Sequence, residues 1–347
     1  MKKHLKQQEL NKIKQLLETA DKDNWELAKQ LLEGAVDLNP SFVTYLFCRA
    51  YLNNDERNRT PLRQLLKSCN KELANLTKSG FTYLLFSSGE RDLKVDRAAF
   101  YDAMQKVLAH PSIKARSIFA VFNQNRHTVY KSQELPTLVQ LLAIEHGFFK
   151  KLESIREIDI PYINVFPKGL ETLPNLTKIS SYSARFKTFP EHFKLLKSLV
   201  RFYFHGLPLD ESLLKADTFK LPNLREISFA YCKIKGEVAF WEALSSCESL
   251  EYLSLPFNKF STISDSIKKL TTLKTLNISQ NKLLHSSDIS IEVFQLPKLQ
   301  KLILNFYPKH QEELKALAKK YNPSLQIDFY SPPSYPENIP AYARDDG

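Results

Sequence analysis

The sequence is poor in the residues that build many catalytic and cofactor sites. Its 347 residues include 8 glycines, 4 cysteines, 2 methionines and 2 tryptophans. So few glycines disfavour a glycine-lined phosphate site, and no GxGxxG, phosphate-loop, HExxH or GxSxG motif occurs. The 8 histidines are scattered along the chain. We therefore predict no catalytic residue and no cofactor, and interpret the chain as a protein that is not an enzyme.

Cysteine is sparse, and long apolar runs are absent. The cysteines form no CxxC pair and no metal-ligand spacing, which predicts reduced thiols and no metal site; they are Cys48, Cys69, Cys232 and Cys247. No apolar run approaches the roughly 20 residues that span a bilayer, which predicts no membrane segment. The first residues, MKKHLKQQELNKIK, are charged and lack the apolar region of a secretory signal. Together these features predict a cytoplasmic protein.

Positive charge is in excess but is not concentrated in one tract. The formal net charge is +11 and the calculated pI is about 9.2, yet runs of Lys and Arg are no longer than pairs. Such a balance permits weak attraction to nucleic acid or to anionic surfaces. The simpler interpretation is a mildly basic surface. The apolar fraction of 43% is sufficient for a substantial core.

Leucine, in contrast, recurs at regular spacing over the second half of the chain. The stretch LKTLNISQNKL begins at Leu273, LEYLSLPFNKF begins at Leu250, and LREISFAYCKI begins at Leu224. Similar frames begin at Ile155, Leu176, Leu199 and Leu299. These stretches resemble the leucine-rich repeat, L-x-x-L-x-L-x-x-N/C-x-L, as found in bacterial proteins. The resemblance implies an α/β fold, a leucine-rich-repeat solenoid whose curved parallel β-sheet forms the concave side.

The ninth position of each frame has a structural interpretation. It is Asn281, Asn258 and Cys232 in the three frames that match best. Where a strand turns away from the sheet, backbone N–H and C=O groups lose their partners, and an amide side chain can both donate and accept. The frames at Ile155, Leu176 and Leu199 have apolar residues at this position, namely Ile163, Ala184 and Leu207. We expect irregular turns in those coils.

The first part of the chain has apolar residues at helical rather than repeat spacing. LNKIKQLLETADKDNWELAKQLLEGAV predicts two helices separated near Asp21 to Asn24, and the later segments to about residue 150 predict further helices. FTYLLF, near Phe81, is the one stretch that favours a strand. We predict an α-helical N-terminal capping domain over 1–150, and leucine-rich repeats over 151–330, with about seven coils, a late helix near Glu312–Tyr321 and a truncated last strand. A proline-rich tail over 331–347 would follow.

A candidate partner surface follows from the repeat frames. Alternation turns the third and fifth positions outward, and four of the seven residues at the eighth position are aromatic. With tyrosines from the other outward positions they form an apolar stripe on the concave face. His205 lies on the concave rim, where a contact role is favoured over acid–base chemistry. The candidate partner-binding residues are Tyr162, Tyr203, His205, Tyr231, Tyr252, Phe257 and Phe306.

Two interpretations of the stripe stay open at this point. Exposed aromatic side chains are favoured as binding anchors, but rings at a strand end can equally pack on neighbouring coils. Three functions are compatible with the sequence. The resemblance favours a non-catalytic scaffold that binds a protein partner on the concave face. The basic charge and the tyrosines suggest a nucleic-acid-binding protein as an alternative. An effector-type enzyme with a site in the helical domain is the third.

Overall fold

The computed structural model of the protein describes residues 3–19, 21–52, 59–76, 93–125, 135–160, 162–182, 184–283, 286–305 and 308–330. The chain divides into two compact units. The helical unit comprises Met1–Leu152 and Pro161–Leu170, and the repeat unit comprises Glu153–Ile160 and Glu171–Gly347. The segment 161–170 therefore belongs to the helical unit, although the repeat spacing places it between two strands. The stretch FTYLLF lies outside the described residues.

The helical unit consists of helices in its described residues, as the apolar spacing predicts. They are α1 (Gln7–Glu18), α2 (Lys22–Leu32), α3 (Pro40–Phe47), which continues into the π-helical turn η1 (Cys48–Leu52), α4 (Arg59–Cys69), α5 (Lys71–Asn75), α7 (Leu93–Ala109), α8 (Ala115–Asn125) and α9 (Leu135–Glu145). No described helix in either unit is both long enough and apolar enough to cross a membrane.

The first two helices show how the sequence sets the local structure. Leu10, Ile13 and Leu17 are buried on one side of α1, at the three- and four-residue spacing of an amphipathic helix. Asp21 is the N-cap of α2, and its carboxylate accepts a hydrogen bond of 2.9 Å from the backbone N–H of Asn24. The break between the helices is thus shorter than expected, because Asn24 already lies inside α2.

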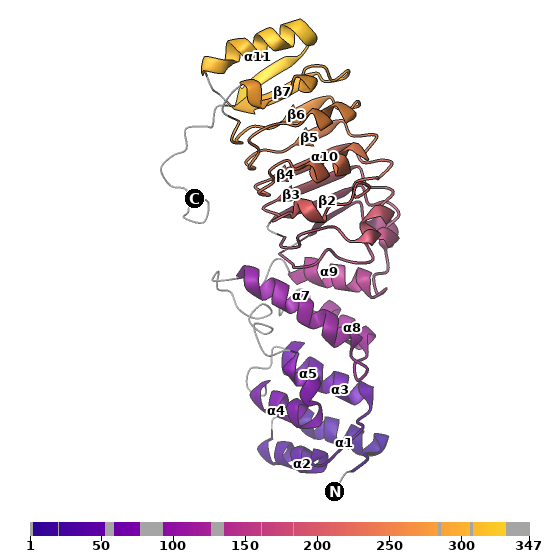
Figure 1. Ribbon diagram of the computed structural model, residues 1–347. Coiled ribbons are helices and arrows are strands. Elements are labelled where there is room, and N and C mark those ends of the chain that lie inside the picture. The colour runs from indigo at the N-terminus through magenta and orange to yellow at the C-terminus, as the bar shows by residue number, and fades with distance from the viewer. Residues whose placement is uncertain are drawn as a thin grey trace. The chain divides into compact units, whose positions relative to one another are not determined.

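The repeat unit is built on one sheet of eight parallel strands that pair in chain order. The strands are β1 (Glu157–Ile160), β2 (Lys178–Tyr182), β3 (Arg201–His205), β4 (Glu226–Ala230), β5 (Tyr252–Ser254), β6 (Thr275–Asn277), β7 (Lys301–Asn305) and β8 (Gln326–Tyr330). Figure 1 shows β2 to β7 stacked one after another. The last strand is as long as β7, so the expected truncation of this strand is wrong.

The strand register confirms the repeat frames. Tyr252 pairs with Thr275, and Thr275 pairs with Lys301, so each frame contributes its third residue to the same row. The leucines that open these frames, Leu250, Leu273 and Leu299, stand directly before their strands at equivalent places and are buried. Successive coils therefore stack their aliphatic side chains in one interior, and this unit is a leucine-rich-repeat solenoid.

Segments between the strands carry short helical turns and two α-helices. They are η3 (Leu170–Thr172), η4 (Glu191–Leu195), η5 (Glu211–Leu213), α10 (Val238–Ser245), η6 (Asp265–Lys269), η7 (Ser286–Asp288), η8 (Ile291–Val293) and α11 (Pro308–Tyr321). The expected late helix is confirmed as α11. One buried carboxylate organises the start of α10: Glu211 accepts hydrogen bonds from the backbone N–H groups of Lys235, Gly236 and Glu237 at 2.6–2.9 Å.

The ninth-position side chains act as the sequence predicts. The amide of Asn258 donates to the backbone oxygen of Phe229 at 2.7 Å, and its oxygen accepts from the N–H groups of Cys232 and Ile234. Asn281 donates in the same way to the backbone oxygen of Leu255 at 2.8 Å. Each amide therefore satisfies the sixth carbonyl of the preceding coil, which the strand ladder has left without a partner.

A thiol fills the same place one coil earlier. The Sγ of Cys232 donates to the sixth carbonyl of the preceding coil, that of Phe204, over 3.7 Å, and to the carbonyl of Ala230 over 3.2 Å. Burial raises the pKa of this thiol to about 12, so it stays protonated and can donate at neutral pH. Cys232 is thus a structural residue, as expected.

Coils without a ninth-position amide are held together differently. The hydroxyl of Ser181 donates to the backbone oxygen of Ile160 at 2.7 Å, so a sixth-position side chain satisfies the sixth carbonyl of the preceding coil. Behind β2 to β4 the core is rich in aromatic rings. The ring of Phe202 lies 4.5 Å from that of Phe204, 5.0 Å from that of Phe193 and 5.9 Å from that of Phe229. Ring packing therefore accompanies the loss of the amide contacts.

Candidate protein-binding surface

The open face is the surface of the sheet that carries the third, fifth and seventh positions of each coil. The register aligns the third positions as Glu157, Lys178, Arg201, Glu226, Tyr252, Thr275, Lys301 and Gln326. It aligns the fifth positions as Asp159, Ser180, Tyr203, Ser228, Ser254, Asn277, Ile303 and Asp328. The outward columns expected from the sequence therefore form continuous rows across the solenoid.

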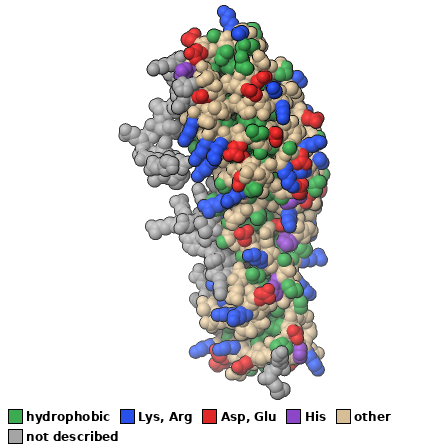
Figure 2. Space-filling view, in the orientation of Figure 1, with side chains coloured by type: hydrophobic (Ala, Val, Ile, Leu, Met, Phe, Trp, Pro, Cys, Tyr) green, Lys and Arg blue, Asp and Glu red, His purple; other side chains and the backbone are tan. Residues whose placement is uncertain are grey.

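Charges on the open face are largely paired with one another. The carboxylate of Glu157 lies 2.9 Å from the Lys178 ammonium and 3.5 Å from the Arg201 guanidinium. The hydrogen bond from Lys178 lowers the pKa of Glu157. Lys301 pairs with Asp328 at 2.6 Å in the last coils. The face in view in Figure 2 likewise has acidic and basic side chains interspersed. The open face thus has no unbroken basic stripe among its described residues.

A shallow groove of about 490 Å³ lies on this face over β2 to β5. Tyr203 and Tyr252 line it together with Glu226, Ser228 and Ala230. The Tyr203 hydroxyl donates a hydrogen bond to the Glu226 carboxylate. Burial, and then this bond, raise the pKa of the Tyr203 phenol, because both disfavour a phenolate. The groove therefore combines half-buried rings with a carboxylate that already accepts a hydrogen bond.

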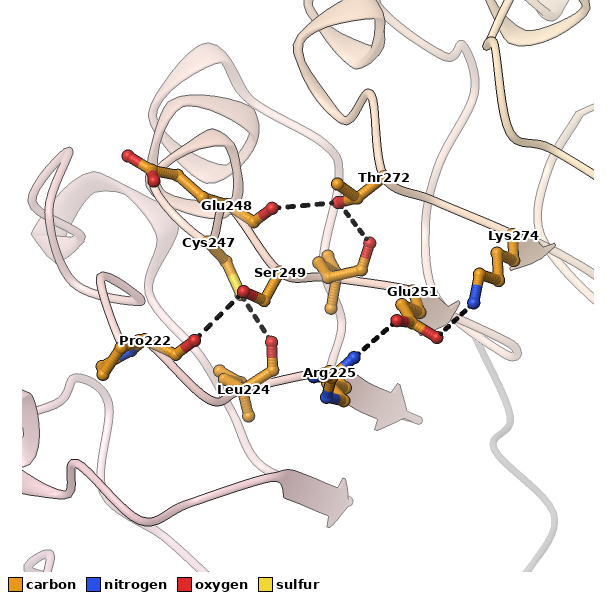
Figure 3. A network of polar contacts seen from close by, with 10 residues as sticks. Pro222, Leu224, Arg225, Cys247, Glu248, Ser249, Glu251, Thr272 and Lys274 are labelled. Atoms are coloured by element: carbon orange, nitrogen blue, oxygen red, sulfur yellow. Dashed lines mark hydrogen bonds and ion pairs between the residues drawn. The ribbon is translucent and has the colours of Figure 1, made fainter.

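The edge of the sheet where strands begin is tied together by polar contacts (Figure 3). The carboxylate of Glu251 bridges Arg225 at 2.7 Å and Lys274 at 2.8 Å, so one ion pair joins each neighbouring coil. The hydrogen bond from Lys274 is the main cause of the lowered pKa of Glu251. Beside it, Thr272 donates to two backbone oxygens of the preceding coil. This charged edge satisfies its polar groups internally.

The edge where strands end carries a row of aromatic rings, which we call the aromatic edge. It consists of Tyr182, His205, Tyr231, Phe257 and Tyr330. Neighbouring ring centroids are 5.8, 4.8, 4.3 and 6.4 Å apart in that order, and Tyr231 and Phe257 stack within 8° of parallel. The side chain of Tyr182 is 70% exposed and that of Tyr231 is 41% exposed. The rings therefore pack on one another and still face solvent.

The backbone explains why rings project at this edge. The N–H of Tyr231 bonds to the carbonyl of Pro256, and the N–H of Phe257 bonds to that of Ser279, so backbone bonding between coils continues past the ends of β4 and β5. The chain must then turn away, and it does so through left-handed conformations with φ of 55° at Tyr231 and 56° at Phe257. Gly206 has the same role and a φ of 73°. Such a backbone costs a non-glycine residue roughly 1–2 kcal/mol.

Just past the aromatic edge lies a row of basic residues at the tenth position of the coils. This basic row consists of Arg185, Lys233, Lys259 and Lys282, all of which are exposed. The three lysines form no ion pair with any described residue. They follow Tyr231, Phe257 and Gln280 by two residues each. Positive charge therefore flanks the aromatic edge.

The structure places the seven predicted surface residues differently from one another. His205, Tyr231 and Phe257 meet in the aromatic edge, and Tyr203 and Tyr252 line the groove. Tyr162 lies in a segment that groups with the helical unit and is 4% exposed, so it is not available for contact on the open face. Phe306 lies outside the described residues.

Two members of the aromatic edge were not predicted from the sequence. Tyr182 and Tyr330 both lie at the end of a strand, as does His205, at the seventh position of their coils or its equivalent. Extending the outward alternation from the third and fifth positions to the seventh identifies all three. The basic row was also missed, and its signal is the lysine that follows the ninth-position residue in three consecutive frames.

The cysteine thiols lie outside the candidate surface residues. All four cysteines are free thiols. Burial raises the pKa of Cys48 and of Cys247 to about 12, which leaves them unreactive as nucleophiles near neutral pH. In the part of the chain that the structure describes, no three His, Cys, Asp or Glu side chains come together as a metal site.

In the comparison with known proteins, this chain showed similarity to solved structures. No family model and no curated protein matches the chain. A leucine-rich-repeat protein of Leptospira interrogans is similar at 28% identity over 48% of this chain, with a TM-score of 0.38; the match spans 40% of that protein. The leucine-rich-repeat domain of the type III effector XopL is 19% identical, over 63% of this chain and 73% of that domain, with a TM-score of 0.39. The repeat assignment rests on the register and ninth-position contacts.

Proposed function

We propose that the repeat unit is a non-catalytic scaffold that binds a protein partner on its concave, open face, centred on the aromatic edge. The observation that carries the proposal is the placement of Tyr231 and Phe257. Glycine would occupy their left-handed positions without strain, as Gly206 does. The chain instead presents two rings there, at a cost in folding free energy of roughly 1–2 kcal/mol each. Rings that stay partly exposed at such a cost favour a role in binding.

Tyr203 and Tyr252 extend this surface into the neighbouring groove. Their rings are half-buried, and a partner that covered them would complete the removal of apolar area from water. His205, between Tyr182 and Tyr231, joins the groove to the aromatic edge. A contiguous surface of this kind suits an extended peptide or a loop of the partner better than a flat protein face.

Binding of single-stranded nucleic acid is the second candidate, and the basic row along the aromatic edge favours it. Bases bind such proteins by stacking on exposed ring faces beside cationic side chains. Tyr231 and Phe257 stack on each other, so one face of each ring is closed to a base. The paired charges on the open face also offer few sites for phosphate. For these two reasons we favour a protein partner over nucleic acid.

The test compares capture of partners by the full chain and by variants. Replacement of Tyr182 and Tyr231 by Ser together should reduce partner capture at least tenfold, because truncated aromatic anchors often cost about 2 kcal/mol or more of binding free energy. The matched control replaces Leu195 and Ile291 by Ser; both side chains are exposed, 54% and 41%, in the turns η4 and η8 away from the open face. Capture is quantified by cross-linking and mass spectrometry.

Circular dichroism and urea unfolding must show that each variant is folded. Equal capture by the aromatic variant and the parent would overturn the proposal. Capture that disappears after nuclease treatment, and that falls steeply as salt rises, would instead identify nucleic acid as the partner. Capture of a protein that survives nuclease and moderate salt, and depends on the two tyrosines, is the expected result.

A further inference from the structure

The aromatic edge ends at the residue from which a proline-rich segment departs. In a parallel sheet every strand ends at the same edge. Tyr330 is the last residue of β8, and its ring meets that of Phe257 edge to face, with 6.4 Å between centroids. The segment 331–347, SPPSYPENIPAYARDDG, follows directly and lies outside the described residues. The residue to which this segment is joined, Tyr330, therefore lies at the aromatic edge.

We propose that this segment binds back along the aromatic edge of its own molecule and competes there with the partner. The inference rests on the proposed function, because it assigns a chemistry to the ligand of the same surface. The partner would then be an extended, proline-containing peptide that replaces the segment. Three features of the residues support the assignment, namely the backbone preference of the segment, its reach and its charge.

Backbone preference favours docking by side chains over addition of a strand. The segment contains Pro332, Pro333, Pro336 and Pro340. Proline lacks an N–H group, so the segment cannot extend the sheet beyond β8 by regular pairing. Closely spaced prolines favour the polyproline II conformation, and grooves lined by aromatic rings are the surfaces that bind it.

Reach is sufficient for the segment to cover the whole edge. From β8 to β2 the sheet has six strand steps of about 4.8 Å each, or about 29 Å in all. Polyproline II rises about 3.1 Å per residue, so about ten residues span that distance. The segment 331–347 is longer than this. Tyr182, which is 70% exposed, therefore lies within its reach.

Charge on the segment complements the basic row. The segment carries Glu337, Asp345 and Asp346 against the single cation Arg344. Lys233, Lys259 and Lys282 flank the aromatic edge and form no ion pair with described residues. A chain that followed the rings would bring its carboxylates beside these ammonium groups. The pairing is solvent-exposed, so it contributes orientation more than affinity.

The test places a photoreactive p-benzoylphenylalanine at Tyr335 of the full chain and maps its cross-links by mass spectrometry. The expected products join residue 335 to peptides that contain Tyr231, Phe257 or Tyr182 in the same molecule, with a yield that does not depend on protein concentration. Substitution of Lys233, Lys259 and Lys282 by Glu should lower that yield at least threefold at low salt. Substitution of the exposed Lys220, Lys268 and Lys269 by Glu is the matched control and should leave it unchanged.

The outcomes separate this inference from the proposed function. Cross-links that avoid the aromatic edge, or a yield that rises with concentration as between two copies, would overturn the intramolecular docking. Partner capture that still required Tyr182 and Tyr231 would then leave the proposed function standing. If the segment does dock, replacing its four prolines by Ala should both lower the cross-link yield and raise partner capture severalfold. Unchanged capture in that variant would contradict the competition.

Discussion

The two edges of the repeat sheet differ in how their side chains are satisfied. At the charged edge, Glu251 bridges Arg225 and Lys274, and hydroxyl groups reach the backbone of the preceding coil. At the aromatic edge, the interior amides satisfy the backbone, while the rings outside them remain partly exposed. The polar groups of the charged edge find their ion-pair and hydrogen-bond partners within the molecule. The aromatic edge leaves apolar surface in water, and this difference is why we locate binding there.

The largest expected effect comes from the interior of the aromatic edge. Asn258→Ala would remove an amide that serves Cys232, Ile234 and Phe229, leaving buried backbone groups without partners. Each lost hydrogen bond to a buried backbone group is strongly destabilising. We expect the free energy of unfolding to fall by about 3 kcal/mol, measured by urea unfolding. Asn223→Ala is the control, since Asn223 bonds to the Lys197 carbonyl at an exposed site. Equal losses for the two variants would contradict the role given to the buried amide.

An intermediate effect on the free energy of unfolding is expected for substitutions at Tyr231, in the aromatic edge. Tyr231→Gly would lose a stacking contact of about 0.5–1.5 kcal/mol but would relieve a left-handed backbone of roughly 1–2 kcal/mol, so the unfolding free energy should change by less than about 1 kcal/mol. Tyr231→Val would lose the contact and keep the strain.

We expect the Val variant to be less stable than the Gly variant by roughly 1–2 kcal/mol, because a β-branched side chain is poorly tolerated at positive φ. Thermal and urea unfolding of the two variants measure this difference. A glycine variant much less stable than the parent would indicate that the ring serves mainly the packing of coils. That result would remove the main support for the binding surface.

The smallest expected effect lies at the charged edge. Lys274, and then Arg225, lower the pKa of Glu251 below its ordinary 4.5. A carboxylate with a lowered folded-state pKa contributes stability above its unfolded pKa, and that contribution is lost as pH falls through the folded pKa. Because these groups are exposed, Glu251→Gln should change the unfolding midpoint little at neutral pH.

The change should vanish in 1 M salt, where screening removes it, and also at a pH well below 4.5. Unfolding measured across salt and pH with the parent alongside tests this. A large effect that persisted in high salt would show that the charged edge contributes to the core of the solenoid rather than to its surface.

Sequence periodicity predicted the solenoid because each coil repeats the same physical requirement. The frames at Leu224, Leu250 and Leu273 lie in register as expected, and Asn258 and Asn281 satisfy backbone groups as expected. Coils that satisfy the same backbone groups without a ninth-position amide were harder to predict. Ser181 at a sixth position has no repeat signal, because any residue that reaches the same carbonyl solves the problem.

The candidate surface was predicted in part. His205, Tyr231 and Phe257 were identified from their columns, whereas Tyr182 and Tyr330 were not. Tyr162 occupies the same column as Tyr231 by spacing, but it is buried, in a segment that groups with the helical unit. The position of a residue in the repeat frame predicts the direction in which its side chain leaves the backbone. The exposure of that side chain depends on the residues that pack against it, and the repeat frame does not predict those residues.

By itself, the sequence determined that aliphatic residues at recurring positions would stack successive coils into a parallel sheet, because side-chain alternation and coil length are local properties. It also determined that amides would stand where the strands end. Tertiary structure decided which rings meet: Tyr231 and Phe257 stack because the coils place them one strand apart, 26 residues along the chain. It likewise decided that Tyr182 remains exposed while Tyr162 is buried, because burial depends on the neighbours that folding brings near.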